Sequence, residues 1–255
     1  MHLTMPGLRQ IFGGTVSAIW GEQRHWESRR RQILMYHSIG GHAAGDTKGL
    51  YSIDPRKFLE QMNFLYELQR TGKIRVVPFG KEEPGCVSIT FDDGYVDNLT
   101  VAAPILEKLD LPFHIFITPD FITKRQVGFL TVEQVKLLAK HDLVTLGIHG
   151  YTHKPLTEHS PLELVDQISR ATQWLSDTTG KSVTTLSYPH GKVNNFVTQV
   201  VAECGITHAA CSKFGPVRPN SDLRQLPRID IWSTDSKRSF AGKIAGRWDW
   251  LQWRT

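Results

Sequence analysis

The chain has 255 residues, of which 40% are hydrophobic and 22% charged, with a formal net charge of +5. This length suits one α/β barrel or two small domains, and the composition is ordinary for a globular protein. No run approaches the roughly 20 apolar residues of a membrane span. The charge is spread along the chain and no nucleic-acid-binding motif is present, so we expect no nucleic-acid partner and only mild attraction to anionic polymers or a membrane surface.

Residues 1–32 are expected to form an N-terminal extension. Their mildly apolar stretch, residues 11–20, contains three glycines or serines and has no long basic segment ahead of it, so it does not have the form of a signal peptide. The three cysteines lack CxxC spacing, which argues against a thiolate zinc site and fits a reducing compartment. We therefore expect a cytoplasmic protein, with peripheral contact at the inner membrane as the alternative.

Short β-rich apolar runs alternate with segments of helical period from residue 33 onward. The predicted strands are 33–36, 86–91, 113–118, 143–148, 183–188 and 207–211. The predicted helices are 55–70, 99–109, 131–141, 160–179 and 194–204, and Pro104 suggests a kink or late start in the second. The repeated β-then-α order favours a parallel sheet or barrel in one domain, which we place at residues 33–235.

Helix-capping residues mark two of these helices. Thr131 and Gln134 form a capping box at the start of 131–141. Ser160 and Glu163 form another at the start of 160–179, and Gly180 ends that helix. These are the most sharply bounded elements of the sequence.

Polar motifs follow four of the predicted strands. His37 follows the first strand, Asp92 and Asp93 the second, His149 the fourth, and Tyr188-Pro189-His190-Gly191 the fifth. In a parallel barrel the carboxyl ends of all strands lie on one face, where active sites form. The sequence therefore predicts that these motifs converge.

One carboxylate from the Asp92-Asp93 pair, with His149 and His153, can hold a divalent metal and leave a coordination position open. This ligand set suits zinc, iron, cobalt or nickel better than magnesium or calcium. The spacing of His149 and His153 fits one face of a helical turn, and Gly150 and Thr152 suit a tight loop leading into it. Alone, an Asp-Asp-Gly sequence is usually a turn and an HxxxH pair is usually structural; their combination at strand ends indicates a site.

These motifs resemble the signatures of the polysaccharide deacetylases (the NodB homology domain, carbohydrate esterase family 4). Thr90-Phe91-Asp92-Asp93-Gly94 matches the first signature, residues 149–153 resemble the second, and residues 188–191 resemble the third. The resemblance covers roughly residues 33–231. It implies a distorted (β/α) barrel and a metal-dependent hydrolase.

The resemblance also implies roles for individual residues. Asp93, His149 and His153 would bind the divalent metal, with zinc expected first and nickel, cobalt or iron as alternatives. Asp92 would be the general base that activates water for attack on the acetamide carbonyl. Tyr188, Pro189 and His190 would contact the substrate, and a backbone N–H near His190 would donate to the oxyanion.

The sequence departs from the family pattern at three points. It lacks the C-terminal Leu-x-His histidine that serves as general acid in much of the family. His37 resembles the N-terminal histidine of the poly-N-acetylglucosamine deacetylase branch, so we expect it to be the acid; the alternative is that it only fixes its loop by hydrogen bonding. Arg228 is the candidate for the missing arginine that orients the base and a candidate substrate contact, or else forms a surface ion pair. Gly150 stands where the family often has Ser or Thr.

The last segment, residues 236–255, is a basic tail rich in tryptophan, which can lie on a membrane surface or pack on the barrel. The expected function is removal of N-acetyl groups from an amino-sugar polysaccharide or lipid-linked glycan, in extracellular or cell-surface polysaccharide biosynthesis. The expected partner is thus an acetylated glycan. Two alternatives are an O-deacetylase or deformylase of a smaller sugar, and a catalytically weakened carbohydrate-binding protein.

Overall fold

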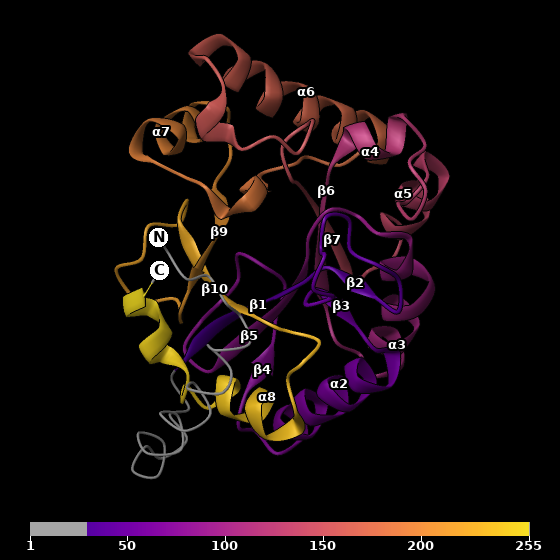
Figure 1. Cartoon of the computed structure of the whole chain (residues 1–255), viewed down its shortest axis with the longest axis vertical. Helices are drawn as coiled ribbons and strands as arrows, with labels where there is room; N and C mark the ends of the chain where they lie inside the picture. Colours follow the sequence, from indigo (N-terminus) through magenta and orange to yellow (C-terminus); the bar gives the residue numbers. More distant parts are fainter. Residues whose placement is uncertain (1–29, 255) are drawn as a thin grey trace.

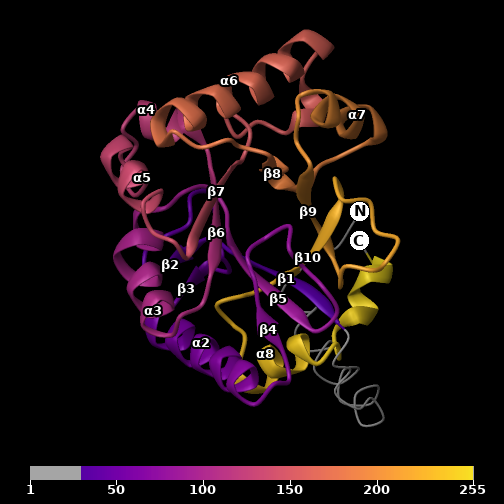
Figure 2. The same ribbon diagram turned by 180° about the vertical axis from the view of Figure 1, so that it is seen from behind.

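The computed structural model describes residues 30–254, so the predicted N-terminal extension falls almost wholly outside the described residues. Parallel strands form a sheet that closes on itself, because β1 pairs with strands on both of its sides. The ring runs β1 (Arg31–Tyr36), β10 (Leu226–Asp230), β9 (His208–Phe214), β8 (Thr185–Ser187), β7 (Val144–Ile148), β6 (Phe113–Ile117), β5 (Cys86–Phe91) and back to β1. The described chain thus forms the predicted (β/α) barrel as one domain (Figures 1 and 2).

Three short strands lie outside this ring. β4 (Arg75–Val76) pairs with the start of β5, and β2 (Ser38–Ile39) pairs with β3 (Ser52–Ile53) as a separate two-stranded sheet. The helices surround the barrel, as Figure 1 shows. They are α2 (Pro55–Arg70), the π-helical turn η1 (Asn98–Ala102), α3 (Ala103–Lys108), α4 (Pro119–Thr123), α5 (Val132–Leu138), η2 (Leu156–Glu158), α6 (Pro161–Thr179), η3 (Pro189–Gly191), α7 (Asn195–Glu203), α8 (Lys237–Ile244) and η4 (Asp249–Arg254).

The best-bounded predictions are confirmed. α2 and β5 have the predicted limits, and both capping boxes are formed, at Thr131 and at Ser160. Gly180 ends α6 in the left-handed conformation that glycine adopts without steric cost. The predicted helix 99–109 is divided into η1 and α3, and Pro104 lies in the first turn of α3.

The C-terminal segment packs on the barrel. Trp248 and Leu251 are buried in the main hydrophobic core, and Trp250 packs against it. Lys243 is also fully buried; its Nζ lies 2.6 Å from Asp235 Oδ2 and 3.9 Å from the centroid of the Trp232 ring. Of the two predictions for the tail, these contacts support packing. Among the helices of the described region, none is long and apolar enough to cross a bilayer.

Candidate active site

The predicted polar motifs line one cavity of about 420 Å³ at the carboxyl end of the barrel strands. Its walls include residues that lie far apart in the sequence and follow different strands: His37, Asp92, Asp93, His149, His153, Tyr188 and His190. The rest of the wall comes mainly from the loop after β2, within residues 43–51, and includes Met35, Tyr95 and Ser212. The expected convergence at the strand ends is therefore present in the fold.

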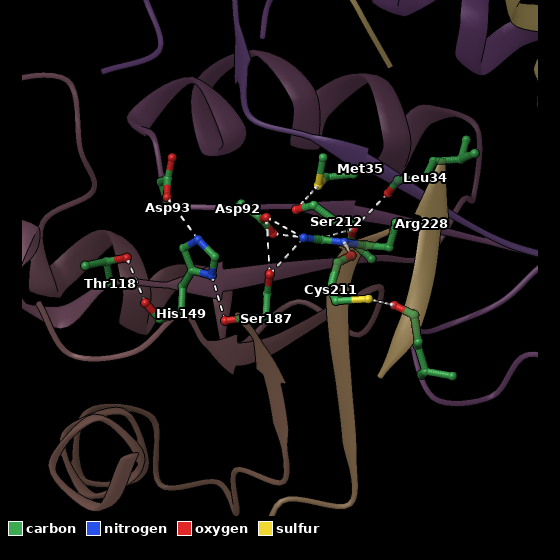
Figure 3. A network of polar contacts seen from close by, with 12 residues as sticks. Leu34, Met35, Asp92, Asp93, Thr118, His149, Ser187, Cys211, Ser212 and Arg228 are labelled. Atoms are coloured by element: carbon green, nitrogen blue, oxygen red, sulfur yellow. Dashed lines mark hydrogen bonds and ion pairs between the residues drawn. The ribbon is translucent and has the colours of Figure 1, made fainter. Parts of the chain in front are cut away.

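The turn after β5 sends the two adjacent carboxylates to different partners. Asp93 has a positive φ of 74° and Gly94 one of 82°. Aspartate tolerates this left-handed conformation better than most residues, and glycine adopts it freely. In Figure 3, Asp92 points toward Arg228 while Asp93 points toward His149. The sequence Asp-Asp-Gly thereby supplies two separate carboxylates from one tight turn.

Asp93, His149 and His153 form a cluster that fits a divalent metal. One ligand atom from each lies within 4.8 Å of the others. Asp93 Oδ1 is 3.0 Å from His153 Nε2 and 3.4 Å from His149 Nε2, yet this buried oxygen has no hydrogen-bond partner among the described residues. A carboxylate oxygen and two imidazole nitrogens that converge in this way are what a metal-binding site requires. The mixed carboxylate and imidazole set suits zinc and similar transition metals.

The ring of His149 is oriented by a carbonyl. Its Nδ1 lies 2.8 Å from the Ser187 carbonyl oxygen, which sets Nδ1 as the donor and leaves the Nε2 lone pair directed at Asp93 (Figure 3). Burial lowers the pKa of His149 to about 4, so the ring is neutral near pH 7. Burial also lowers the pKa of His153, but the close Asp93 carboxylate raises it above the usual value. His149 is therefore in the protonation state that a ligand needs.

The prediction that the two histidines share a helical turn is wrong. The segment from His149 to His153 is a loop, in which Gly150 and His153 have φ values of 66° and 67°. The left-handed backbone at these two residues turns the loop so that both imidazole rings reach Asp93. A Cβ at Gly150 would lie 3.1 Å from Pro189 Cγ, so glycine lets the loop pack closely on the third motif. That contact gives a physical reason for glycine at a position where the family often has Ser or Thr.

Arg228 binds the Asp92 carboxylate from outside the cavity lining. Its Nη1 donates to Asp92 Oδ1 at 2.8 Å and its Nη2 to Oδ2 at 2.7 Å, while its Nε donates to the Cys211 carbonyl. Ser187 Oγ donates to Asp92 Oδ2 at 3.2 Å. Burial raises the pKa of Asp92, but the Arg228 and His149 charges lower it by more, and the result is a pKa of about 2. Because Arg228 is fully buried and lies outside the cavity lining, its position favours the base-orienting role over a substrate contact.

His37 lies at the cavity wall with its ring 4.6 Å from that of Tyr51. Its Nδ1 has no hydrogen-bond partner in the described part of the chain. The structure also draws Asp230, on the same strand as Arg228, into this region. Burial raises the pKa of Asp230, and Lys243, Arg228 and His37 act against that rise. Sequence reasoning missed Asp230, Ser187 and Tyr51 as residues of this region; the i+2 spacing from Arg228 on one strand is the signal that could have found Asp230.

The three predicted substrate contacts of the third motif differ in their exposure. His190 is exposed, has a φ of 57°, and its ring centroid is 4.6 Å from that of His153. Pro189 is buried next to Gly150. Tyr188 lines the cavity but is nearly fully buried, and its hydroxyl donates to the Arg224 carbonyl. His190 is thus the most accessible of the predicted substrate contacts in this motif.

Comparison with known proteins matches this arrangement to one family. A family model described as polysaccharide deacetylase matches residues 79–209, just over half of the chain. The chain is 25% identical over 218 residues to YxkH of Bacillus subtilis, a protein assigned to the polysaccharide deacetylases, covering 83% of this chain and 75% of that protein. It is 26% identical over 238 residues to the poly-β-1,6-N-acetyl-D-glucosamine N-deacetylase of Staphylococcus aureus, covering 87% and 75%.

The fold matches as well. The solved structure of IcaB from Ammonifex degensii superimposes with a TM-score of 0.73 at 21% identity, covering 88% of this chain and all of that one. The predicted resemblance is thereby confirmed at the level of sequence model, relatives and fold. The chain is an enzyme that belongs to the polysaccharide deacetylase family.

Proposed function

We propose that this enzyme is a metal-dependent N-deacetylase of an amino-sugar polymer of the poly-β-1,6-N-acetylglucosamine type, and that residues 33–235 carry the activity. The single observation that supports it most is the Asp93–His149–His153 cluster beside an Asp92 carboxylate held by Arg228. The Staphylococcus aureus relative, whose name specifies that polymer, supports the substrate class. We place the reaction in the modification of an exopolysaccharide.

In this proposal Asp93, His149 and His153 hold the metal, which supplies Lewis-acid polarisation of the acetyl carbonyl and a lowered pKa for water. Asp92 is ionised at neutral pH and takes the proton of the attacking water. Arg228 keeps the carboxylate in one orientation while this proton moves. The residue pair therefore provides both the base and its alignment.

His37 donates the proton to the leaving amine when the carbon–nitrogen bond breaks. The overall balance is one water consumed, one acetate released and one amine left on the sugar. After product release Asp92 gives its proton to solvent and His37 takes one up from solvent, so both groups return to their starting states. The open Nδ1 of His37 and its place in the cavity wall support this assignment.

The test measures acetate released from β-1,6-linked N-acetylglucosamine oligomers, together with the metal content of each variant. Asp92→Asn should lower kcat by about 10²–10⁴-fold and keep its metal, because it removes only the base. Asp93→Asn should lose the metal. Asp166→Asn, which removes an exposed carboxylate on α6, is the matched control and should behave as wild type.

Two results would contradict the proposal. The first is full activity in protein stripped by a chelator and shown to be metal-free. The second is metal loss in Asp92→Asn with metal retained in Asp93→Asn, which would reverse the two roles. Acetate release from O-acetylated but not N-acetylated sugars would instead identify an O-deacetylase.

A further inference from the structure

We propose that Asp97 and Asn98 are positioning residues for His37: together they clamp the chain segment that carries this histidine. The inference rests on the proposed function, because it takes His37 as the general acid. It concerns two residues downstream of the Asp-Asp-Gly turn that line no part of the cavity. Both are buried, and Asn98 is fully so.

The clamp is a connected set of hydrogen bonds. Asn98 Nδ2 donates to the His37 carbonyl at 2.8 Å and to Asp97 Oδ1 at 3.1 Å. Asp97 Oδ2 accepts from Ser38 Oγ at 2.5 Å and from the Gly41 N–H at 3.1 Å. The two acceptors around Nδ2 fix the orientation of the Asn98 amide. Both carboxylate oxygens of Asp97 are thus committed, and three of the five residues from His37 to Gly41 are tied to one buried centre.

The Asp97 side chain bonds to a segment outside the helix that carries it. Asp97 directly precedes η1 and has helical φ and ψ values of −71° and −16°, as part of the helical run that starts at Val96. Here the Asp97 side chain makes no capping hydrogen bond and turns to the segment after β1 instead. η1 itself is a π-helical turn, a geometry that is frequent at functional sites. The carboxylate therefore joins this helix to the segment that follows His37.

Gly41 gives independent support for a close approach. A Cβ at Gly41 would lie 2.6 Å from Asp97 Oδ2 and 2.9 Å from Ser38 Oγ, which is too near for any side chain. Glycine is required here by proximity to the carboxylate, since no positive φ is involved. The segment after His37 is thus built to lie against Asp97.

The clamp matters for His37 because little else holds its ring. The barrel ladder between β1 and β5 ends at the Tyr36–Phe91 pair, one residue before His37. The imidazole Nδ1 has no hydrogen-bond partner among the described residues, and the ring packs on Tyr51. The direction of the ring therefore depends on its backbone, which Asn98 holds at the His37 carbonyl and the pairing of β2 with β3 holds from Ser38 onward. A displacement of about 1 Å at a reacting group can cost about 100-fold in rate.

The experiment compares two substrates of the metal-loaded enzyme. An N-acetylglucosamine oligomer needs a protonated leaving amine, whereas 4-nitrophenyl acetate releases a phenolate that needs no acid. We expect Asn98→Ala to lower kcat for the amide by about 10–100-fold and to leave kcat for the ester within about twofold of wild type. Gly41→Ala, on an exposed residue, should give the same selective loss by pushing the segment away from Asp97. His37→Ala should show the largest loss of kcat for the amide relative to the ester.

Thr100→Ala is the matched control, because Thr100 lies in the same η1 turn, is exposed, and its hydroxyl donates to the Val96 carbonyl of its own helix. In the His37→Ala background, Asn98→Ala should add no further loss for the amide. Equal losses on both substrates, or a further loss in the double variant, would show a general structural role and overturn the clamp. If His37→Ala is not selective while Asp92→Asn is inactive, the clamp fails and the deacetylase function stands. If wild-type enzyme releases no acetate from the oligomer, the proposed function itself fails.

Discussion

At the scale of single residues, the site depends on the hydrogen bonds from one buried arginine to one carboxylate. Arg228 and Asp92 are both almost fully buried, and two nearly parallel hydrogen bonds join them. A planar guanidinium can make this two-point contact, whereas an ammonium group cannot. The contact fixes the orientation of the base and keeps it ionised.

We therefore expect Arg228→Lys to lower kcat by roughly 10–100-fold through misalignment, because the charge remains but the two-point contact is lost. Arg228→Gln removes the charge as well, so the pKa of Asp92 should rise from about 2. Asp92 works as a base only when deprotonated, and its activity is lost as pH falls through its pKa. The acid limb of the kcat/KM profile should thus move to higher pH in Arg228→Gln, as measured between pH 3 and 8.

Arg170→Lys, an exposed arginine paired with Asp166 on α6, is the matched control and should leave the profile unchanged. Thermal unfolding of each variant separates loss of alignment from loss of fold. A wild-type rate and profile in both Arg228 variants would show that the base needs no arginine.

The sequence identifies some residues of the site but not others. Asp92, Asp93, His149 and His153 carry recognisable spacing, because the chemistry requires them close together along short segments. Arg228 lies 136 residues from Asp92 and could only be suggested as a replacement. Asp230 and Ser187 carry no motif, since their relation to the site exists only after the strands pair. Residues whose partners are distant in sequence are thus the ones that spacing cannot reveal.

At the scale of elements, the η3 turn must lie against β9 for the third motif to reach the cavity. A Cβ at Gly191 would come within 2.3 Å of Ser212 Cβ and 2.7 Å of its backbone nitrogen. The backbone of β9 cannot move aside easily, because β9 pairs with β8 and β10 on its two sides. Gly191 therefore sets the distance between η3, which carries His190, and the strand that carries Ser212.

Gly180 and Gly191 form a matched pair of test positions, because both have a φ of 68° but only Gly191 is crowded. Gly180→Ala should lower the free energy of unfolding by roughly 1–2 kcal/mol from backbone strain alone and leave kcat unchanged. Gly191→Ala should cost about 1–3 kcal/mol more through overpacking, and should also lower kcat. Chemical denaturation and acetate release measure the two effects. Equal losses of stability in the two variants would show that the η3 turn has room to move.

Capping residues located the starts of helices: α5 and α6 begin directly after Thr131 and Ser160, although α5 ends at Leu138, before the predicted limit of 141. Ser160, Glu163 and Gly180 specify where α6 begins and ends by local hydrogen bonds, so the sequence contains that information. The loop from His149 to His153 was predicted as helical because its spacing fits a turn of helix. Its true path depends on left-handed residues and on contact with Pro189, which no local rule predicts. β10 has no clear strand pattern in the sequence, because its five residues include Pro227 and two charged side chains.

At the scale of the whole molecule, closure of the barrel assembles the site. β1 lies between β5 and β10, so His37 follows a strand whose neighbours lead to Asp92 on one side and carry Arg228 on the other. The order of β and α segments predicts a parallel sheet, but an open sheet would have left these strands apart. The family resemblance, and not the periodicity, predicted the closed form.

Closure also buries a histidine that does not line the cavity. His114, on β6, lies in the core with its Nδ1 2.7 Å from Thr145 Oγ1 and its Nε2 3.2 Å from Thr185 Oγ1. Burial lowers its pKa to about 3, and the nearby Asp92 and Arg228 charges act in opposite directions. The folded protein therefore keeps this ring neutral at pH values where the unfolded chain, with a pKa near 6.5, binds a proton.

The sign of the effect on stability follows from this difference. Above about pH 6.5 neither state is protonated at His114, so the free energy of unfolding does not depend on this group. Below that pH the unfolded chain alone gains a proton, and the folded state loses about 2 kcal/mol of relative stability by pH 5. His114→Gln should remove this contribution, so its urea-unfolding free energy should fall by about 2 kcal/mol less than that of wild type between pH 7 and 5. His42→Gln, at an exposed histidine, should retain the wild-type dependence, and parallel curves for wild type and His114→Gln would show that His114 is protonated in the folded barrel.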